Sequence, residues 1–274
     1  MSRPAGLVAE LLGILIVGGQ DRFSRDGLAD MLWPSGEVDR RRHNLNTTLW
    51  RLRKAIEDSS VDEQWISSSR NGFVSFNRQV EYSCDVELFE GTVARYRSTR
   101  TADLADDELD ELRSAEAMYR GELLEGVMSE WVLPHRDRLR RLHNECVLKL
   151  LKATRRMGTV EECVYWGEKI LESDPFREDV HRTLIELYED TGQTGRAITQ
   201  YNRLRSVLQE ELDADPSRET QALYYRVIDR TTADAAARSG PTPEDIGAVL
   251  DHLETLHRDL SDGLKMLADY LSRN

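Results

Sequence analysis

The sequence lacks any apolar run long enough to cross a lipid bilayer. Its longest such run, residues 5–19, has 15 residues and contains Glu10, whereas a membrane-spanning helix needs roughly 20 apolar residues. The acidic residue inside this run also argues against a secretory signal, whose apolar region is uncharged. The sequence therefore excludes a transmembrane protein and favours a cytoplasmic one.

Cysteine is scarce, with three residues in a chain of 274. Cys84, Cys146 and Cys163 are 62 and 17 positions apart, which fits neither a C-x-x-C motif nor a disulfide framework. The six histidines show no H-E-x-x-H spacing, and no G-x-x-x-x-G-K-[ST] or G-x-S-x-G motif occurs. The sequence thus predicts a reduced protein that has no metal, no cofactor and no enzymatic activity.

Charge is abundant, and it is unevenly distributed along the chain. There are 37 basic and 50 acidic residues, which give a formal net charge of -13. Residues 1–78 have 11 basic and 10 acidic side chains, so the acidic excess belongs to the rest of the chain. Residues 40–54 contain six basic side chains and no acidic one. An acidic protein therefore contains one basic segment, as nucleic-acid-binding proteins often do.

Residues 1–80 have the pattern of a winged helix-turn-helix domain. Apolar spacing predicts a first helix that ends at Gly18 and Gly19, and a second helix over 24–32 that Ser24 caps. A third helix is expected over 37–57, and its predicted buried stripe is Leu45, Leu49, Leu52 and Ile56. Asn71 and Gly72, between Trp65-Ile66 and residues 73–76, predict a β-hairpin.

The side of the third helix opposite this stripe carries groups suited to DNA. Arginine can pair with guanine, threonine can touch a thymine methyl group, and lysine or histidine can meet a phosphate. Arg70, at the tip of the hairpin, is placed to contact a minor groove. The predicted DNA-binding residues are Arg40, His43, Asn44, Thr47, Trp50, Arg51, Lys54 and Arg70. A solvated face of an ordinary helical bundle is the alternative explanation.

Several segments resemble one family of regulators. LADMLWP (28–34) and NLNTTLWRLRKAI (44–56) resemble the DNA-binding domain of the Streptomyces antibiotic regulatory protein (SARP) type of activator, which is similar to OmpR/PhoB winged helices. In that family a bacterial transcriptional activator domain follows the DNA-binding domain. Four further segments of this chain resemble it: CDVELFEG (84–91), YRGELLEG (119–126), DPFREDVHR (174–182) and YNRLRSVLQEELDADPSRET (201–220). The resemblance implies an activator that binds repeats in double-stranded DNA near promoters and recruits RNA polymerase.

The chain departs from that family at its beginning. In such regulators an antiparallel sheet precedes the first helix, whereas only six residues precede Leu7 here. Either the chain has dispensed with the sheet, or the usual start lies upstream. Because the sheet packs beside the three helices, its loss would weaken the DNA-binding domain. The alternative function is therefore a protein-interaction adaptor with weakened or lost DNA binding.

A period of 34 residues marks the region 81–230. Leu150 and Leu151 match Leu184 and Ile185, Gly158 matches Gly192, and Cys163 matches Ala197. This is the period of tetratricopeptide (TPR) repeats, in which pairs of helices stack and their surfaces bind protein partners. We therefore expect a TPR-like helical domain over 81–230, which either binds a partner or only holds the activator together.

The end of the chain predicts a linker, 231–243, and an amphipathic helix, 244–274. Apolar residues of this helix recur at alternating steps of 4 and 3, as in the seam of a coiled coil. An isolated helix of this length is marginal, so the seam must pack on something. We predict a homodimer or higher oligomer, with docking on the repeat domain as the alternative. The predicted oligomerisation residues are Leu250, Leu253, His257, Leu260, Leu264, Leu267 and Leu271.

The complete sequence therefore predicts a mainly α protein. A winged helix-turn-helix domain comes first, a TPR-like helical repeat domain follows it, and a C-terminal amphipathic helix ends the chain.

Overall fold

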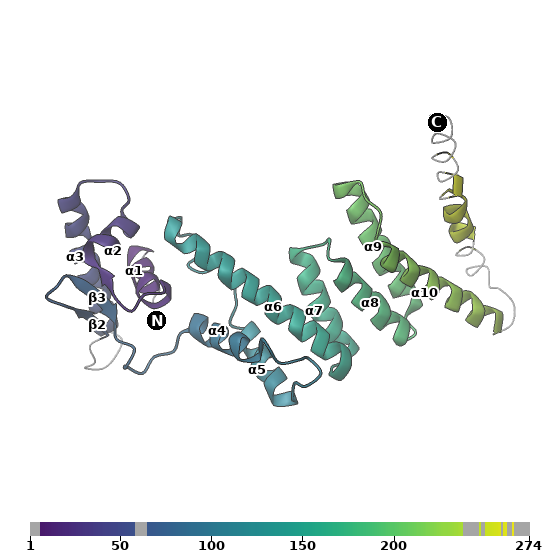
Figure 1. Ribbon diagram of the computed structural model, residues 1–274, viewed down its shortest axis with the longest axis horizontal. Coiled ribbons are helices and arrows are strands. Elements are labelled where there is room, and N and C mark those ends of the chain that lie inside the picture. The colour runs from purple at the N-terminus through teal and green to yellow at the C-terminus, as the bar shows by residue number, and fades with distance from the viewer. Residues whose placement is uncertain are drawn as a thin grey trace. The chain divides into compact units, whose positions relative to one another are not determined.

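The computed structural model describes residues 6–57, 65–237, 247, 250–258, 260, 261 and 265. The chain divides into two compact units, Met1–Gly158 and Thr159–Asn274. Helices dominate both units (Figure 1), which confirms the predicted mainly α fold class. Among the described residues, no helix has the length and apolar character that a membrane span requires.

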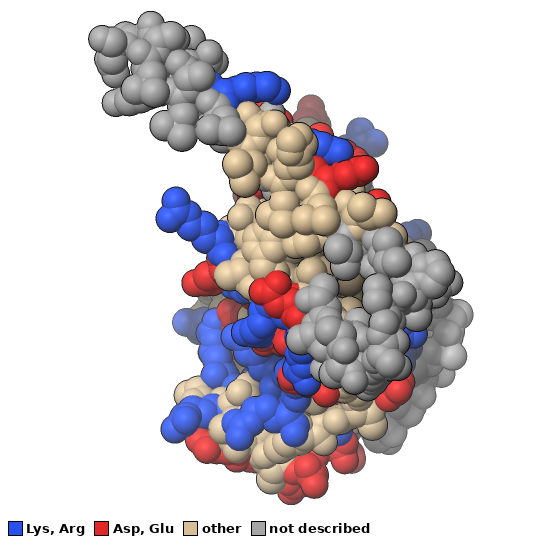
Figure 2. All heavy atoms as spheres, turned by 90° about the vertical axis from the view of Figure 1, so that its right-hand side faces the viewer, with Lys and Arg blue, Asp and Glu red and all other residues tan. Residues whose placement is uncertain are grey.

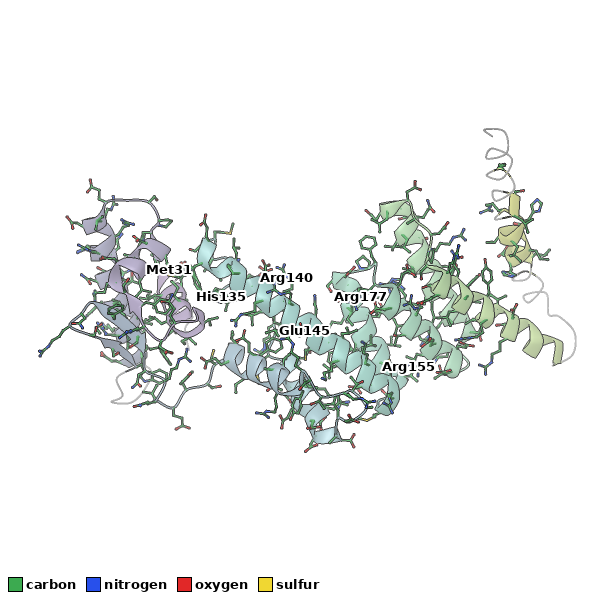
Figure 3. All side chains as sticks on the ribbon, in the orientation of Figure 1. Met31, His135, Arg140, Glu145, Arg155 and Arg177 are labelled. Atoms are coloured by element: carbon green, nitrogen blue, oxygen red, sulfur yellow. The ribbon has the colours of Figure 1, made fainter. Side chains whose placement is uncertain are left out.

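Three helices open the first unit where the sequence predicted them: α1 (Gly6–Val17), α2 (Arg25–Leu32) and α3 (Val38–Glu57). Ser24 caps α2, because its hydroxyl oxygen accepts a hydrogen bond from the backbone N–H of Gly27 at 3.0 Å. The predicted stripe of α3 faces the core: Leu45, Leu49 and Leu52 are buried, and Ile56 is half-buried. Met31 of α2 packs against the same core (Figure 3).

The predicted hairpin is present as β2 (Ile66–Ser68) and β3 (Phe73–Phe76), which pair antiparallel. Gly72 closes the turn with a φ of +77°, a left-handed conformation that favours glycine. A third strand, β1 (Phe23–Ser24), pairs with the other edge of β3, so the sheet order is β1-β3-β2. The sequence did not predict β1, because two residues cannot show an alternating pattern.

The rest of the first unit consists of α4 (Asp85–Tyr96), α5 (Asp106–Glu116), the 3-10 turn η1 (Glu130–Val132) and α6 (Leu133–Met157). Arg136 of α6 holds the loop before it, since its guanidinium donates to the carbonyls of Leu123, Leu124 and Val127 at 2.8, 2.7 and 2.9 Å. Arg140 and Glu145 follow along α6 (Figure 3) and pair with Glu122 and Arg97.

As far as Ala237, the described part of the second unit consists of four helices: α7 (Val160–Ser173), α8 (Glu178–Asp190), α9 (Thr194–Leu212) and α10 (Arg218–Ala237). A Cβ atom on Gly167 would lie 2.7 Å from Leu184 Cδ2, so this glycine lets α7 and α8 approach closely. The repeat positions Cys163 and Ala197 are both buried, at 0% and 1% exposure. The structure therefore confirms TPR-like packing, in which small residues lie where neighbouring helices meet.

The end of the repeat differs from the expected domain limits. Helix α10 runs to Ala237, through the first half of the segment 231–243 that was expected to be a linker. The reason is local, because residues 235–237 are three alanines, the residue with the highest helix propensity. The remainder of that segment lies outside the described residues.

On the face shown in Figure 2, basic and acidic side chains lie beside one another. Within the second unit, Arg203 pairs with Glu168 at 2.6 Å and Arg226 with Glu189 at 3.0 Å. Each of these two arginines is therefore partnered by a carboxylate of a neighbouring helix.

His181 is a buried polar residue between α8 and α9, with 1% of its surface exposed. Its Nδ1 lies 2.9 Å from Gln200 Nε2, and its Nε2 lies 3.2 Å from the carbonyl oxygen of Pro175. Because the amide nitrogen of Gln200 can only donate, Nδ1 of His181 accepts and Nε2 carries the proton, so the ring is neutral. Burial lowers the pKa of His181 and keeps this neutral form.

We expect acid to destabilise the second unit through His181. In the unfolded chain this ring takes up a proton below its ordinary pKa of 6.5, whereas the folded ring resists protonation. Unfolding therefore becomes easier as the pH falls through that value. Circular dichroism between pH 7.5 and 5.5 should show a falling Tm for the wild-type chain. His181→Asn should start at a lower Tm but lose less of it over the same interval.

The exposed His43 provides the matched control, since His43→Asn should follow the wild-type pH dependence. Equal losses of Tm in the wild-type chain and in His181→Asn would show that His181 does not carry the effect.

Candidate nucleic-acid interface

Seven of the eight predicted DNA-binding residues lie on α3, and their exposure matches the predicted face. Arg40, His43, Trp50, Arg51 and Lys54 are exposed, while Asn44 and Thr47 are half-buried. Arg70 is also exposed, in the turn between β2 and β3. The winged helix therefore presents the predicted residues on two elements, the third helix and the wing.

Three of the six basic side chains in residues 40–54 bond to other parts of the protein. Arg42 forms a bidentate ion pair with Asp26 of α2, with Nε and Nη2 at 2.7 and 3.0 Å from its two oxygens. This guanidinium lowers the pKa of the Asp26 carboxyl. Arg41 pairs with Asp30, also on α2. These two ion pairs hold α2 and α3 together.

Arg53 is directed toward the wing, because its Nη2 donates to Ser68 Oγ at 2.6 Å. Among the described residues, no ion pair engages Arg40, Arg51 or Lys54. The ammonium of Lys54 lies 5.3 Å from the centre of the Trp50 ring, a cation–π contact. Three unpaired cations therefore remain on the outward face of α3, available to an anion such as a phosphate.

Two further arginines lie near this face and were missed by the sequence reasoning. Arg25, at the start of α2, hydrogen-bonds to Asn46 of α3. Arg22 is exposed, and its guanidinium carbon lies 5.1 Å from the centre of the Phe73 ring of β3. Only the unpredicted pairing of β1 with β3 places Arg22 beside the wing, so no local signal could have identified it.

Helix α1 is covered by the segment that precedes α6, and we call this contact the α1 joint: Glu10, Gly13, Leu124 and Trp131. Glu10 is 5% exposed, and its Oε1 accepts a hydrogen bond of 2.9 Å from the indole Nε1 of Trp131. A Cβ atom on Gly13 would lie 2.7 Å from Leu124 Cδ1. Trp131 also packs against the core of the winged helix. A side chain from beyond residue 80 therefore completes that core.

A second contact holds the connecting segment between β3 and α4. The guanidinium of Arg78 donates to the carbonyl of Ile16 at 2.9 Å and pairs with Glu87 of α4. Tyr82 donates its hydroxyl to the same carboxylate at 2.7 Å, and its ring packs edge-on against Phe76. The winged helix and α4 are thus joined by polar bonds as well as by the α1 joint.

No metal site accompanies this face: within the part of the chain that the structure describes, no three His, Cys, Asp or Glu residues are grouped so that they could hold an ion.

A winged helix-turn-helix followed by a TPR-like array of helices defines a class of bacterial regulators. The family described as the bacterial transcriptional activator domain matches residues 84–228, more than half of the chain. The chain belongs to this family and is a transcriptional regulator of the SARP type, which confirms the predicted resemblance.

Curated relatives agree with this assignment. The transcriptional regulatory protein MoaR1 of Mycobacterium tuberculosis (strain ATCC 25618 / H37Rv) is 23% identical over 226 residues, which cover 82% of this chain and 72% of the relative. The protein of the same name from Mycobacterium bovis (strain BCG / Pasteur 1173P2) is 23% identical over 227 residues, with the same coverage.

A solved structure shares the fold. Mycobacterium tuberculosis EmbR, solved in complex with a low affinity phosphopeptide, matches with a TM-score of 0.62 at 20% identity. The match covers 83% of this chain, and the chain spans 60% of the length of that structure.

We expect Trp131→Phe to destabilise the first unit. Phenylalanine keeps an aromatic ring at the joint but cannot donate to Glu10, and an unsatisfied buried polar group costs about 1–3 kcal/mol. Urea denaturation should show this loss in the free energy of unfolding. In a Glu10→Leu background, which removes the acceptor, Trp131→Phe should lower the free energy of unfolding by a smaller amount.

Trp166→Phe is the matched control, since the indole of Trp166 is also buried but donates its hydrogen bond, at 3.2 Å, to Glu162 of its own helix. Equal costs of Trp131→Phe with and without Glu10 would refute the role of this hydrogen bond.

Proposed function

We propose that the chain is a transcriptional activator that binds double-stranded DNA through α3 and the wing. In this proposal residues 1–80 are the DNA-binding domain, and residues 81–230 are the activator domain. The observation that carries it is the division of the basic side chains: Arg41, Arg42 and Arg53 bond to neighbouring elements, whereas Arg40, Arg51 and Lys54 stay exposed and unpaired among the described residues.

In this arrangement α3 enters the major groove with its outward face toward the bases. Arg51 and Asn44 can hydrogen-bond to base edges, while Arg40, His43 and Lys54 meet phosphates along the groove. Arg70 at the tip of the wing reaches the adjacent minor groove, as wings can. The ion pairs of Arg41 and Arg42 with α2 keep α3 at a constant angle to α2.

The helical domain would recruit RNA polymerase, as the resemblance to SARP-type activators implies. Its TPR-like packing supports this role, since stacked helix pairs expose extended surfaces that bind proteins. The alternative, an adaptor that has lost DNA binding, is less well supported. The α1 joint covers one side of the winged helix, because Trp131 and Leu124 lie against α1 there.

We further propose that two copies associate through the C-terminal helix, whose residues 250–258 are helical. Leu250, Leu253 and Leu260 are 54%, 54% and 64% exposed, and His257 is exposed as well. The helix contacts the repeat domain with a different side, because the ring of His252 packs on Tyr225 of α10 at 5.9 Å. The seam is thus left open to a second copy. Leu264, Leu267 and Leu271 lie outside the described residues.

We expect Arg51→Ala to weaken DNA binding at least tenfold, because the loss of one base or phosphate contact costs about 1–3 kcal/mol. The probe is a duplex that the full-length wild-type chain enriches from a random library, and fluorescence anisotropy measures the Kd at several salt concentrations. If Arg51 contacts a phosphate, the slope of log Kd against log salt should fall by about 0.9.

Arg120→Ala removes the same charge from an exposed site away from α3, and it should bind like the wild type. Equal affinities for both variants, or the failure of the wild-type chain to enrich any duplex, would refute DNA binding through α3 and favour the adaptor.

We expect Leu253→Asp to reduce the mass of the protein in solution from a dimer or higher oligomer to a monomer. A carboxylate buried in an apolar seam carries a large desolvation cost. Sedimentation of the full chain measures the change. Leu212→Asp is the matched control, because Leu212 is equally exposed, at 56%, but lies at the end of α9. A wild-type chain that sediments as a monomer would refute the self-association.

A further inference from the structure

The centre of the outward face of α3 is apolar. Trp50 is 60% exposed, and it lies about one turn after Thr47 on the same side of the helix. The hydroxyl of Thr47 donates to the backbone carbonyl of His43 at 3.2 Å. Since this polar atom is satisfied within the helix, the methyl group is what Thr47 offers to a ligand. The two side chains form what we call the apolar centre.

Cations surround this apolar centre. Lys54 lies over the ring of Trp50, with its ammonium 5.3 Å from the ring centre. This contact favours a defined position of the indole and places a positive charge at its edge. Arg40 and Arg51 are exposed on the same face. The face therefore combines an apolar middle with a basic rim.

A DNA major groove has one apolar group that matches such a middle. The methyl group of thymine is the only aliphatic group that the bases present there, and phosphates line both sides of the groove. A protein partner would also bury Trp50, but unpaired cations around it would then require acidic groups at matching positions. The charge pattern therefore favours DNA over a protein partner, because the phosphates of DNA already supply negative charges around the groove.

We propose that Trp50 and Thr47 select thymine methyl groups at the centre of each half-site, and this inference rests on the proposed DNA binding by α3. Hydrogen bonds from Arg51 and Asn44 would read neighbouring base edges, while the apolar centre distinguishes thymine from cytosine or uracil. Trp50 is then a residue that determines sequence specificity and contributes little to the electrostatic attraction.

The experiment removes single methyl groups from the DNA. The probe is the duplex enriched by the full-length wild-type chain, and each thymine is replaced in turn by uracil, which keeps the hydrogen-bonding groups. For the wild type, one or two replacements should weaken binding about fourfold each, the equivalent of one buried methyl group. For Trp50→Ala the same replacements should change the Kd less than twofold.

Arg40→Ala serves as the matched control from the same face, because Arg40 is exposed on α3 and does not hold the indole of Trp50. It should keep the sensitivity to uracil but lower the salt slope by about 0.9, whereas Trp50→Ala should leave that slope unchanged. Because Trp50 is exposed, its replacement should preserve the circular dichroism spectrum and the Tm.

Three results would overturn the inference. If no uracil replacement changes the Kd of the wild type, the protein binds DNA but does not recognise thymine methyl groups. Unchanged DNA affinity of Trp50→Ala with an altered sedimentation mass would show that the apolar centre is a protein interface. If the wild type enriches no duplex at all, both this inference and the proposed DNA binding fail.

Discussion

The hydrogen bond between Trp131 and the buried carboxylate of Glu10 links the two halves of the first unit. A buried carboxylate is costly unless a donor satisfies it, so α1 is stable in this position only when the segment before α6 lies against it. Trp131 also adds its ring to the core of the winged helix. The winged helix is therefore not a separate body on a linker, because its core includes a side chain from the segment that precedes α6.

The arginines of α3 fall into two groups, those that bond to neighbouring elements and those that stay exposed. Arg41 and Arg42 pair with carboxylates of α2, and Arg53 bonds to the wing, so these residues set the geometry of the domain. Arg40 and Arg51 stay exposed and form no ion pair with any residue that the structure describes. Exposed ion pairs contribute only modestly to stability. Their larger effect is to orient the helix that carries the unpaired residues.

Much of this organisation could be predicted, and the exceptions have a common cause. The stripe of Leu45, Leu49 and Leu52, the cap at Ser24 and the turn at Gly72 are local patterns, and the structure confirms each of them. Strand β1 was missed because its two residues are ordered only by pairing with β3. The predicted linker is helical as far as Ala237, since alanine, which is frequent there, has the highest helix propensity of all residues.

The sequence by itself determined the first three helices, the hairpin and the basic face of α3, because each depends on residues close to one another along the chain. It also showed the 34-residue repeat, because matching residues recur at that fixed spacing. The tertiary structure decided which arginines remain unpaired, where Arg22 lies, and what covers α1. These features depend on pairs such as Glu10 and Trp131, which are 121 positions apart. Spacing along a chain carries no information about such contacts, since only the packing of separate elements brings them within hydrogen-bonding distance.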